Sequence, residues 1–286
     1  GQNLNYVKAG TGSLTLGGGS SNTFAGFTVT GGTLILAKTG GAVAIPSNLI
    51  VGTPFGTNAQ VRLMGPDQIA SSATLTLNPK SVFDMNGFNQ SLGRLTGPEG
   101  GLVVNNATGT QAVLTLGTCG ATGGIFGGTI ADNTTGTGTL AVTKVGGGEV
   151  TLSGVNRFSG PLTVTGGTLA FLKGESLGSG ISSNSVMIDG GVLKYIGTGS
   201  VDMGASRRLG LGSTGGIINV SSATGVLTVS GGIDPASVGS LTKSGPGTLT
   251  LPGTTDMSGL DIIVTEGRLI AGFGQDGLGG ITVGGG

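Results

Sequence analysis

Few side chains in this sequence are suited to chemistry, and the residue that most often serves as a catalytic base is missing. The chain contains no histidine, which removes the base of a Ser-His-Asp triad and the usual nitrogen ligand of zinc. Residues 174–178 match the Gly-x-Ser-x-Gly pattern of a nucleophile elbow around Ser176. With no base available and no helix pattern after it, we interpret this segment as a turn. The sequence therefore predicts no catalytic residue, no cofactor and no metal site.

Paired carboxylates cleave glycans in many enzymes, so the 13 acidic residues are the remaining source of catalysis. They are scattered, and we interpret the one cluster with arginine, Asp202 with Arg207 and Arg208, as a solvated turn. Residues 271–278 resemble one unit of the calcium-binding β-roll repeat. Because that site takes its ligands from tandem copies, a single copy predicts a plain turn. A polysaccharide-active enzyme is the least favoured function.

The elements that position these residues are short strands separated by glycine turns. Glycine supplies 64 of 286 residues, the apolar share is 36%, and only 9% of residues are charged. Residues 73–77 and 225–229, among others, alternate with the period of a strand, and no long window has helical spacing. The 4% aromatic content argues against a sandwich or a propeller. We predict an all-β fold, a parallel β-helix (β-solenoid) that forms a single elongated domain over residues 1–286 without terminal caps.

One phrase, Lys-x-Gly-x-Gly-x-(Leu/Val)-Thr-Leu with a later closing Gly-x-Leu, occurs three times, over residues 8–34, 144–169 and 243–269. The recurring positions are Lys8, Gly10, Gly12, Asn22 and Gly32; Lys144, Gly146, Gly148, Asn156 and Gly167; and Lys243, Gly245, Gly247 and Gly267. We expect the lysines to limit lateral strand pairing as exposed gatekeepers, or alternatively to form a charged stripe for a partner. We expect the two asparagines to close turns or to stack as a short amide ladder.

These repeats resemble the autotransporter-associated β-strand repeat of secreted or surface-displayed bacterial proteins. The likeness is close over the three copies and looser in the intervening residues 44–49 and 84–88. It implies a right-handed parallel β-helix exported from a bacterial cell, and therefore an extracellular or cell-surface location. It implies no catalytic residues, because the repeat is a signature of fold.

The two ends of the predicted solenoid are candidates for self-association. Open strand edges template pairing unless they are covered, and no sequence resembling a polar cap precedes Leu4 and Tyr6 or follows Ile281 and Val283. Stacking of the last coil of one subunit on the first coil of the next would not close on itself, so it would produce a filament. The partner predicted first is therefore a second copy of the chain.

The predicted function is that of a non-enzymatic structural protein whose solenoid subunits stack head-to-tail into a filament or a surface fibre. The alternative is the passenger of an adhesin, which would contact a cell surface or a glycan. Charges balance at 13 of each sign without runs, so nucleic acid is not expected as a partner, and no apolar stretch is long enough to span a membrane. The single cysteine, Cys119, is expected to be a small buried side chain.

Overall fold

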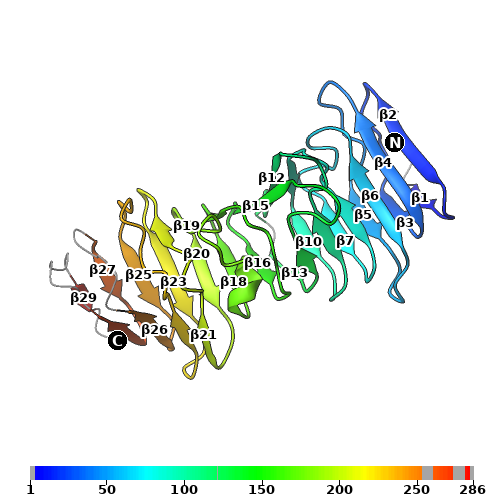
Figure 1. Ribbon diagram of the computed structural model, residues 1–286. Coiled ribbons are helices and arrows are strands. Elements are labelled where there is room, and N and C mark those ends of the chain that lie inside the picture. The colour runs from blue at the N-terminus through cyan, green and yellow to red at the C-terminus, as the bar shows by residue number, and fades with distance from the viewer. Residues whose placement is uncertain (1–3, 121, 253–259, 273–280, 284–286) are drawn as a thin grey trace.

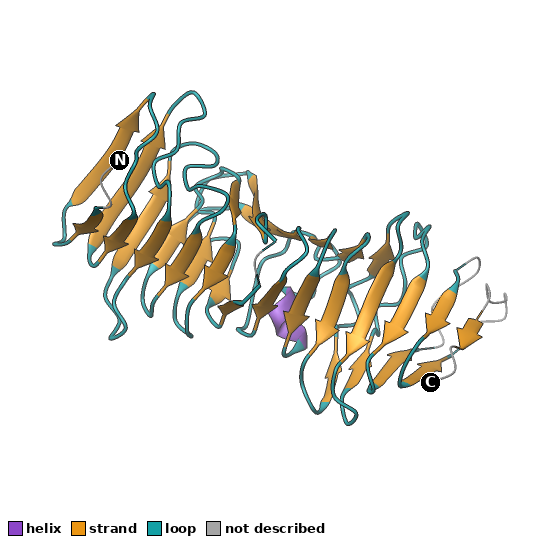
Figure 2. Cartoon of the chain, turned by 180° about the vertical axis from the view of Figure 1, so that it is seen from behind, coloured by secondary structure: helices purple, strands orange, loops and turns teal. Residues whose placement is uncertain are grey.

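The chain forms an elongated parallel β-solenoid with its two termini at opposite ends of the rod (Figure 1). The computed structural model describes residues 4–120, 122–252, 260–272 and 281–283. Among these residues the one helix is a 3₁₀ turn, η1 (Gly174–Leu177), drawn in purple amid the strands in Figure 2. The predicted all-β class and parallel solenoid are confirmed.

Each coil of the chain contributes to two or three faces. The first face holds β1 (Asn5–Lys8), β3 (Gly26–Val29), β5 (Asn48–Val51), β7 (Thr74–Leu77), β10 (Arg94–Thr96), β13 (Gly124–Phe126), β16 (Glu149–Leu152), β18 (Thr168–Phe171), β20 (Val192–Tyr195), β23 (Gly216–Val220), β25 (Leu241–Ser244), β27 (Ile262–Val264) and β29 (Ile281–Val283). These strands form two sheets that meet at a parallel bridge between Gly97 and Phe126.

The strands of the second face follow first-face strands in the chain. They are β2 (Ser13–Gly18), β4 (Gly32–Lys38), β6 (Ala59–Leu63), β8 (Val82–Asp84), β11 (Leu102–Val104), β14 (Thr129–Ile130), β21 (Ser200–Asp202), β24 (Val226–Thr228), β26 (Thr248–Leu251) and β28 (Arg268–Ala271). The third face holds β9 (Gln90–Leu92), β12 (Gln111–Leu116), β15 (Thr139–Lys144), β17 (Leu162–Val164), β19 (Val186–Ile188) and β22 (Leu209–Leu211).

Alternation along each strand builds the core. In β7 the two leucines are buried while the two threonines face outward, as the period of two requires. Leu75 is in register with Leu49 on the coil before it and with Leu95 on the coil after it. Each buried leucine contributes about 1.5–3 kcal/mol, and stacking identical side chains in register keeps the narrow core filled. One continuous cluster of buried apolar residues results.

The three repeat lysines are buried, which corrects the prediction that they are exposed gatekeepers or a charged stripe. Lys8 is 7% exposed, and Lys144 and Lys243 are fully buried. Each ammonium donates to three main-chain carbonyl oxygens at distances between 2.7 and 3.0 Å. An ammonium group has three donors, so its bonding capacity is filled inside the protein. The lysines therefore stabilise the turns that follow them and do not limit pairing at a strand edge.

The acceptors of these bonds follow one pattern in all three copies. Lys144 binds the carbonyls of Val145 and Gly146, which follow it directly, and that of Gly166 on the next coil. Burial lowers the pKa of the Lys144 ammonium, while the carbonyl acceptors favour its charged form. We call this arrangement, a lysine that joins its own turn to the next one, the lysine clamp.

The closing glycine of each copy allows the two turns to approach. Gly32 has a φ of 64°, in the left-handed region that glycine tolerates best. A Cβ atom at Gly32 would also collide with the carbonyl oxygens of Gly10 and Gly12 and with Nζ of Lys8. Gly167 and Gly267 lie in the same way over the glycines of their own copies. The recurrence of glycine with lysine is thus a single packing requirement.

The copies do not occupy the same corner of the solenoid. The first copy connects β1 on the first face to β2 on the second, and the third copy connects β25 to β26 in the same way. The second copy connects β15 on the third face to β16 on the first. The repeat therefore specifies a strand–clamp–strand corner and not a fixed position around the axis.

The repeat asparagines bind main-chain groups of neighbouring coils, and they do not form an amide ladder with each other. Nδ2 of Asn22 donates to the carbonyl of Ala44 at 2.8 Å. Asn156 donates to Ser176 on the next coil and accepts from the amide of Ile130 on the preceding one. The predicted role in turn closure is refined, since each side chain joins successive coils.

Removal of one clamp should destabilise the solenoid measurably. Lys144→Met retains the length and apolar stem of the side chain but leaves three buried carbonyls without their donor. We expect a loss of about 3 kcal/mol in the free energy of unfolding, measured by urea denaturation. Lys173→Met, at a partly exposed lysine, should change it by less than about 0.5 kcal/mol. Equal stabilities for the two variants would contradict the clamp.

Candidate functional site

The residues that the sequence singled out for chemistry do not form a reactive centre. Ser176 is fully buried in η1, and its hydroxyl has no hydrogen-bond partner among the described residues. The segment is a 3₁₀ turn and not a strand-to-helix elbow, in agreement with the prediction. Residues 273–278 of the β-roll-like segment lie outside the described residues. Within the described ranges, no group of three or more metal-ligating side chains comes together.

The interpretation of Asp202, Arg207 and Arg208 as a solvated turn is wrong for Arg207, which is 1% exposed. Its guanidinium donates to Oδ1 of Asn184 and to the main-chain carbonyls of Gly174, Gly178 and Met203. Burial lowers its pKa to about 10, although the charges of Glu175 and Asp202 oppose the shift. Arg207 remains charged at neutral pH and ties η1 to the next coil, as the clamp lysines tie their turns.

Two further expectations can be compared with the structure. Cys119 is exposed, which corrects the expectation of a buried side chain, because it lies in the turn after β12 and not on the inner face of a strand. Leu4 and Tyr6 are 46% and 48% exposed at the first coil. Ile281 and Val283 pair with Ile262 and Val264 through β29. Self-association of these two ends remains a proposal.

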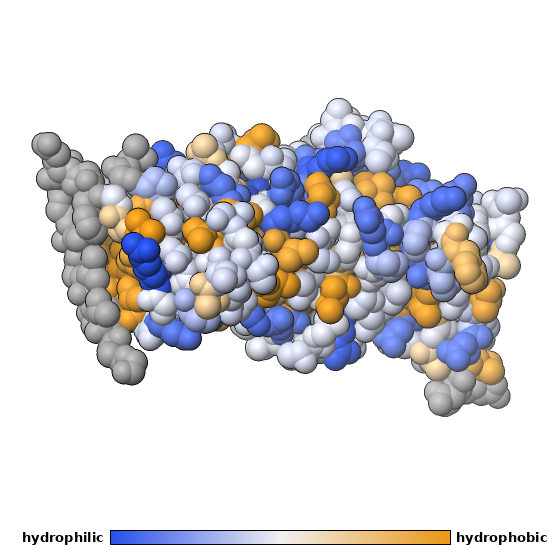
Figure 3. Space-filling model, turned by 90° about the horizontal axis from the view of Figure 1, so that it is seen from below, coloured by the Kyte–Doolittle hydropathy of each residue, from blue (hydrophilic) through white to orange (hydrophobic). Residues whose placement is uncertain are grey.

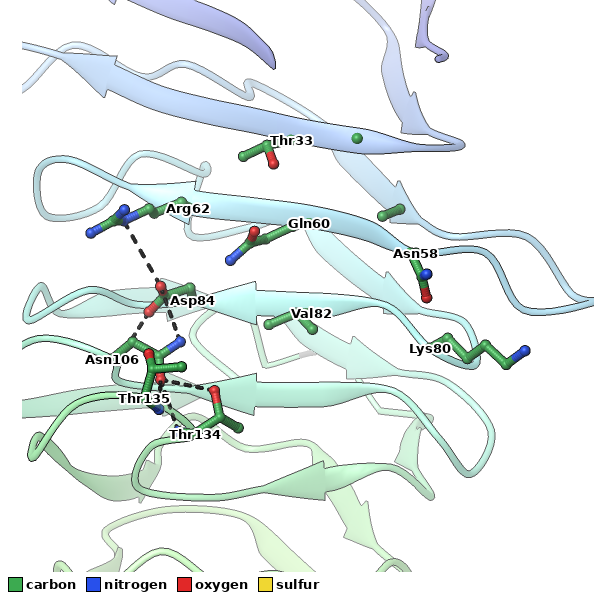
Figure 4. A pocket seen from close by; sticks show the side chains of 12 residues that line it. Thr33, Asn58, Gln60, Arg62, Lys80, Val82, Asp84, Asn106, Thr134 and Thr135 are labelled. Atoms are coloured by element: carbon green, nitrogen blue, oxygen red, sulfur yellow. Dashed lines mark hydrogen bonds and ion pairs between the residues drawn. The ribbon is translucent and has the colours of Figure 1, made fainter. Parts of the chain in front are cut away.

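An organised polar surface lies in a groove on the second face, over β4, β6 and β8. It has a volume of about 480 Å³. Its lining residues are Gly32, Thr33, Asn58, Ala59, Gln60, Arg62, Lys80, Val82, Asp84, Asn106, Thr134 and Thr135. Figure 4 shows Arg62 and Lys80 at opposite ends, with Gln60 and Val82 between them. We call this surface the polar groove.

Strand register brings the lining side chains together. Gln60 pairs with Val82, and Arg62 pairs with Asp84 one coil later. The alternation of β6 leaves Gln60 partly exposed and Arg62 exposed, because the residues beside them, Ala59, Val61 and Leu63, are buried. The sequence analysis did not identify this pair. Arg62 and Asp84 are separated in the sequence by one coil, and this spacing identifies them as neighbours only when the strand register is known.

Asp84 organises one end of the groove and is itself only 2% exposed. Its Oδ1 accepts from the amides of Asn86 and Asn106 at 3.0 and 3.1 Å, and its Oδ2 accepts from Nδ2 of Asn106 at 3.3 Å. Nε of Arg62 lies 3.9 Å from Oδ2, and Nη2 of Arg62 donates to Oδ1 of Asn86 at 2.8 Å. A carboxylate that is satisfied in this way positions its neighbours.

Asn106 continues this network into the loop that borders the groove. Its Oδ1 accepts from the amides of Thr134 and Thr135 at 2.8 and 3.2 Å, and from the hydroxyl of Thr134 at 3.1 Å. The wall formed by residues 134–135 is therefore attached to the sheet through Asp84. The groove is a built feature and not a chance gap between loops.

On the face shown in Figure 3, apolar residues occur as separate patches among polar ones. Within the described residues no helix is long and apolar enough to cross a membrane.

Comparisons with known proteins agree with the repeats found in the sequence. Residues 7–36, 142–171 and 241–271 match the passenger-associated-transport-repeat. The chain carries three copies of this repeat, so the resemblance predicted from the sequence is confirmed. A curated relative, the adhesin BmaC autotransporter of Brucella suis biovar 1 (strain 1330), is 31% identical over 240 residues. The alignment covers 79% of this chain and 7% of the relative. No solved structure matches the chain.

The attachment of the groove wall can be tested by hydrogen exchange. Asn106→Ala removes the acceptor of the Thr134 and Thr135 amides, so these amides should exchange at least about tenfold faster, corresponding to about 1.4 kcal/mol of lost local protection. Asn219→Ala is the matched control, because its amide binds Ser244 in a distant coil. Unchanged exchange at residues 134–135 in Asn106→Ala would show that the wall is held by other contacts.

Proposed function

We propose that this chain is a non-enzymatic segment of an autotransporter passenger that is displayed outside a bacterial cell and acts as an adhesin. The observation that carries the proposal is the presence of three passenger-associated-transport repeats in a solenoid with an organised polar groove on its outer face. The adhesin relative supports this reading better than the filament predicted first. The relative is much longer than this chain, and adhesion by this chain is part of the proposal.

A non-enzymatic role is supported by how the polar residues are used. The chain lacks histidine, and Ser176 is buried. Asp84, the acidic residue of the groove, accepts hydrogen bonds from amide groups and contacts Arg62. These contacts occupy both carboxylate oxygens inside the fold, which suits a positioning group and not a general acid. The groove is thus equipped for recognition.

Adhesion can be measured directly with the folded chain. Fluorescent beads coated with the protein should adhere to cultured epithelial cells severalfold more than beads coated with albumin. The excess should be abolished by soluble protein added as a competitor, because the contact sites are saturable. Equal adherence of the two kinds of bead would contradict the adhesive function.

As a second proposal, the first coil stacks on another copy of the chain. Tyr6 packs against Phe24 and Phe27, with ring centroids 5.4 and 6.3 Å apart, yet it is 48% exposed, and Val7 is 64% exposed. Among the described strands β1 pairs only with β3. An aromatic cluster with one half-exposed tyrosine, on a strand that pairs on one side, is a suitable surface for association.

Self-association should depend on this cluster. Sedimentation analysis should show mass increasing with protein concentration, and Tyr6→Lys should reduce that increase because it places a charge in the contact. Phe55→Lys is the control, since Phe55 is a 96% exposed aromatic outside the cluster. A chain that stays monomeric over the whole concentration range would overturn this second proposal.

A further inference from the structure

We propose that the polar groove binds a carboxylate-bearing saccharide, with Arg62 and Lys80 as cationic contacts and Asn58 and Gln60 as hydrogen-bonding contacts. This inference deepens the adhesive function proposed above and rests on it for its biological setting. The groove itself, its charge and its free polar groups are properties of the structure. They determine the class of ligand.

The accessible charge of the groove is positive. Arg62 and Lys80 line it with exposed side chains. The one carboxylate of the lining, Asp84, is buried and bound to amide groups of residues 86 and 106. Nε of Arg62 lies 3.9 Å from Oδ2 of Asp84, so the carboxylate offsets part of the Arg62 charge. With Lys80 in the lining as well, two cations stand against one carboxylate, and a ligand meets an excess of positive charge. In a chain with only 9% charged residues and no net charge, this concentration of positive charge favours an anion.

Several polar groups of the groove are free to bind a ligand. The side chains of Asn58, Gln60 and Lys80 have no hydrogen bond or ion pair within the part of the chain that the structure describes. Figure 4 shows Asn58 and Gln60 between the two cationic ends. A planar amide offers both donors and an acceptor, and guanidinium pairs with a carboxylate through two parallel bonds. A sugar that carries hydroxyl groups and a carboxylate can bond to the amides through its hydroxyl groups and to the guanidinium through its carboxylate.

The shape and the apolar content of the groove favour a saccharide over other anions. The volume of about 480 Å³ lies in the range of small-molecule sites, so the space exceeds that needed for a single inorganic anion. The lining contains no aromatic side chain, which disfavours single-stranded nucleic acid, because its bases stack on aromatic rings. The partly exposed Val82 supplies a small apolar surface that suits the C–H face of a sugar ring.

Lys80 provides an independent indication of function. Its φ is 63°, in the left-handed region that is uncommon for a non-glycine residue and is worth examining for function. The position is a tight turn, with the amide of Ser81 donating to Asn78 and the amide of Lys80 donating to Gly100. Glycine would satisfy this backbone with less strain. A lysine here gives the groove a cation at the expense of local backbone energy.

Binding can be measured by calorimetry with defined probes. The acidic probes are 3′-sialyllactose, which ends in a sialic acid, and trigalacturonate, which consists of uronic acids; lactose and maltotriose are the neutral comparators. The wild-type chain should bind at least one acidic probe at least tenfold more tightly than either neutral one. Binding of sialyllactose alone indicates a terminal sialic acid, whereas binding of trigalacturonate alone indicates an internal uronate. Equal binding of acidic and neutral probes, or no binding of any of them, would overturn the inference.

Three variants separate ligand contacts from folding. Arg62→Gln and Lys80→Gly should each weaken binding of the acidic probe at least tenfold. Lys80→Gly should keep or raise the melting temperature, because glycine relaxes the left-handed turn. Arg208→Gln removes one exposed charge outside the groove and should leave binding unchanged. Acidic-probe affinities that are the same in all three variants would refute the assignment, as would full competition by sulfate at matched ionic strength.

The inference and the adhesive function can fail separately. If coated beads adhere to cells but Lys80→Gly and Arg62→Gln beads adhere equally well, adhesion stands and the groove is not its binding site. If the acidic probe binds in the groove but the beads do not adhere, the site stands and the adhesive function falls. Loss of both adhesion and probe binding in the same variants supports both.

Discussion

The lysine clamp is the interaction on which the three repeat corners of the solenoid depend. A sharp turn between parallel strands points several main-chain carbonyls toward one interior point, where each would cost about 1–3 kcal/mol if left without a donor. One ammonium supplies three donors and joins two successive turns. The carbonyls in turn stabilise a charge that burial alone would disfavour. Lysine and glycine recur together because neither packs at this corner without the other.

Internal attachment leaves the outer faces free to vary. Inward positions hold a stacked apolar core, and side-chain amides such as that of Asn156 bond to coils on both sides. Outward side chains contribute little to the core or to the bonds between coils, so Gln60 and Arg62 can face solvent without loss of the fold. Apart from Gly32 and Thr33 at the end of the first repeat copy, the lining of the polar groove belongs to coils between the first and second copies. In these coils the core holds the strand spacing and does not dictate the outward side chains.

The sequence predicted the fold better than it predicted the roles of charged residues. Strand alternation and repeated turns are local signals, so the parallel solenoid followed from them. The burial of Lys144 and Arg207 did not, because a buried cation is visible only when the carbonyls that surround it are placed in space. The groove was missed for a related reason. Arg62 and Asp84 become neighbours through register, and unequal coil lengths hide that register in the linear sequence.

The position of the repeat copies connects these observations. Since the second copy occupies a different corner from the first and third, the clamp is a local device that can close any strand–turn–strand corner. Corners without it must be closed by other means, and Lys80 lies in one of them with a φ of 63°. Glycine would satisfy that backbone best, as it does at Gly32. A cation stands there instead, with its side chain in the groove and no partner in the described chain. The unfavourable backbone conformation of Lys80 therefore occurs at the polar groove, where its unpaired charge faces solvent.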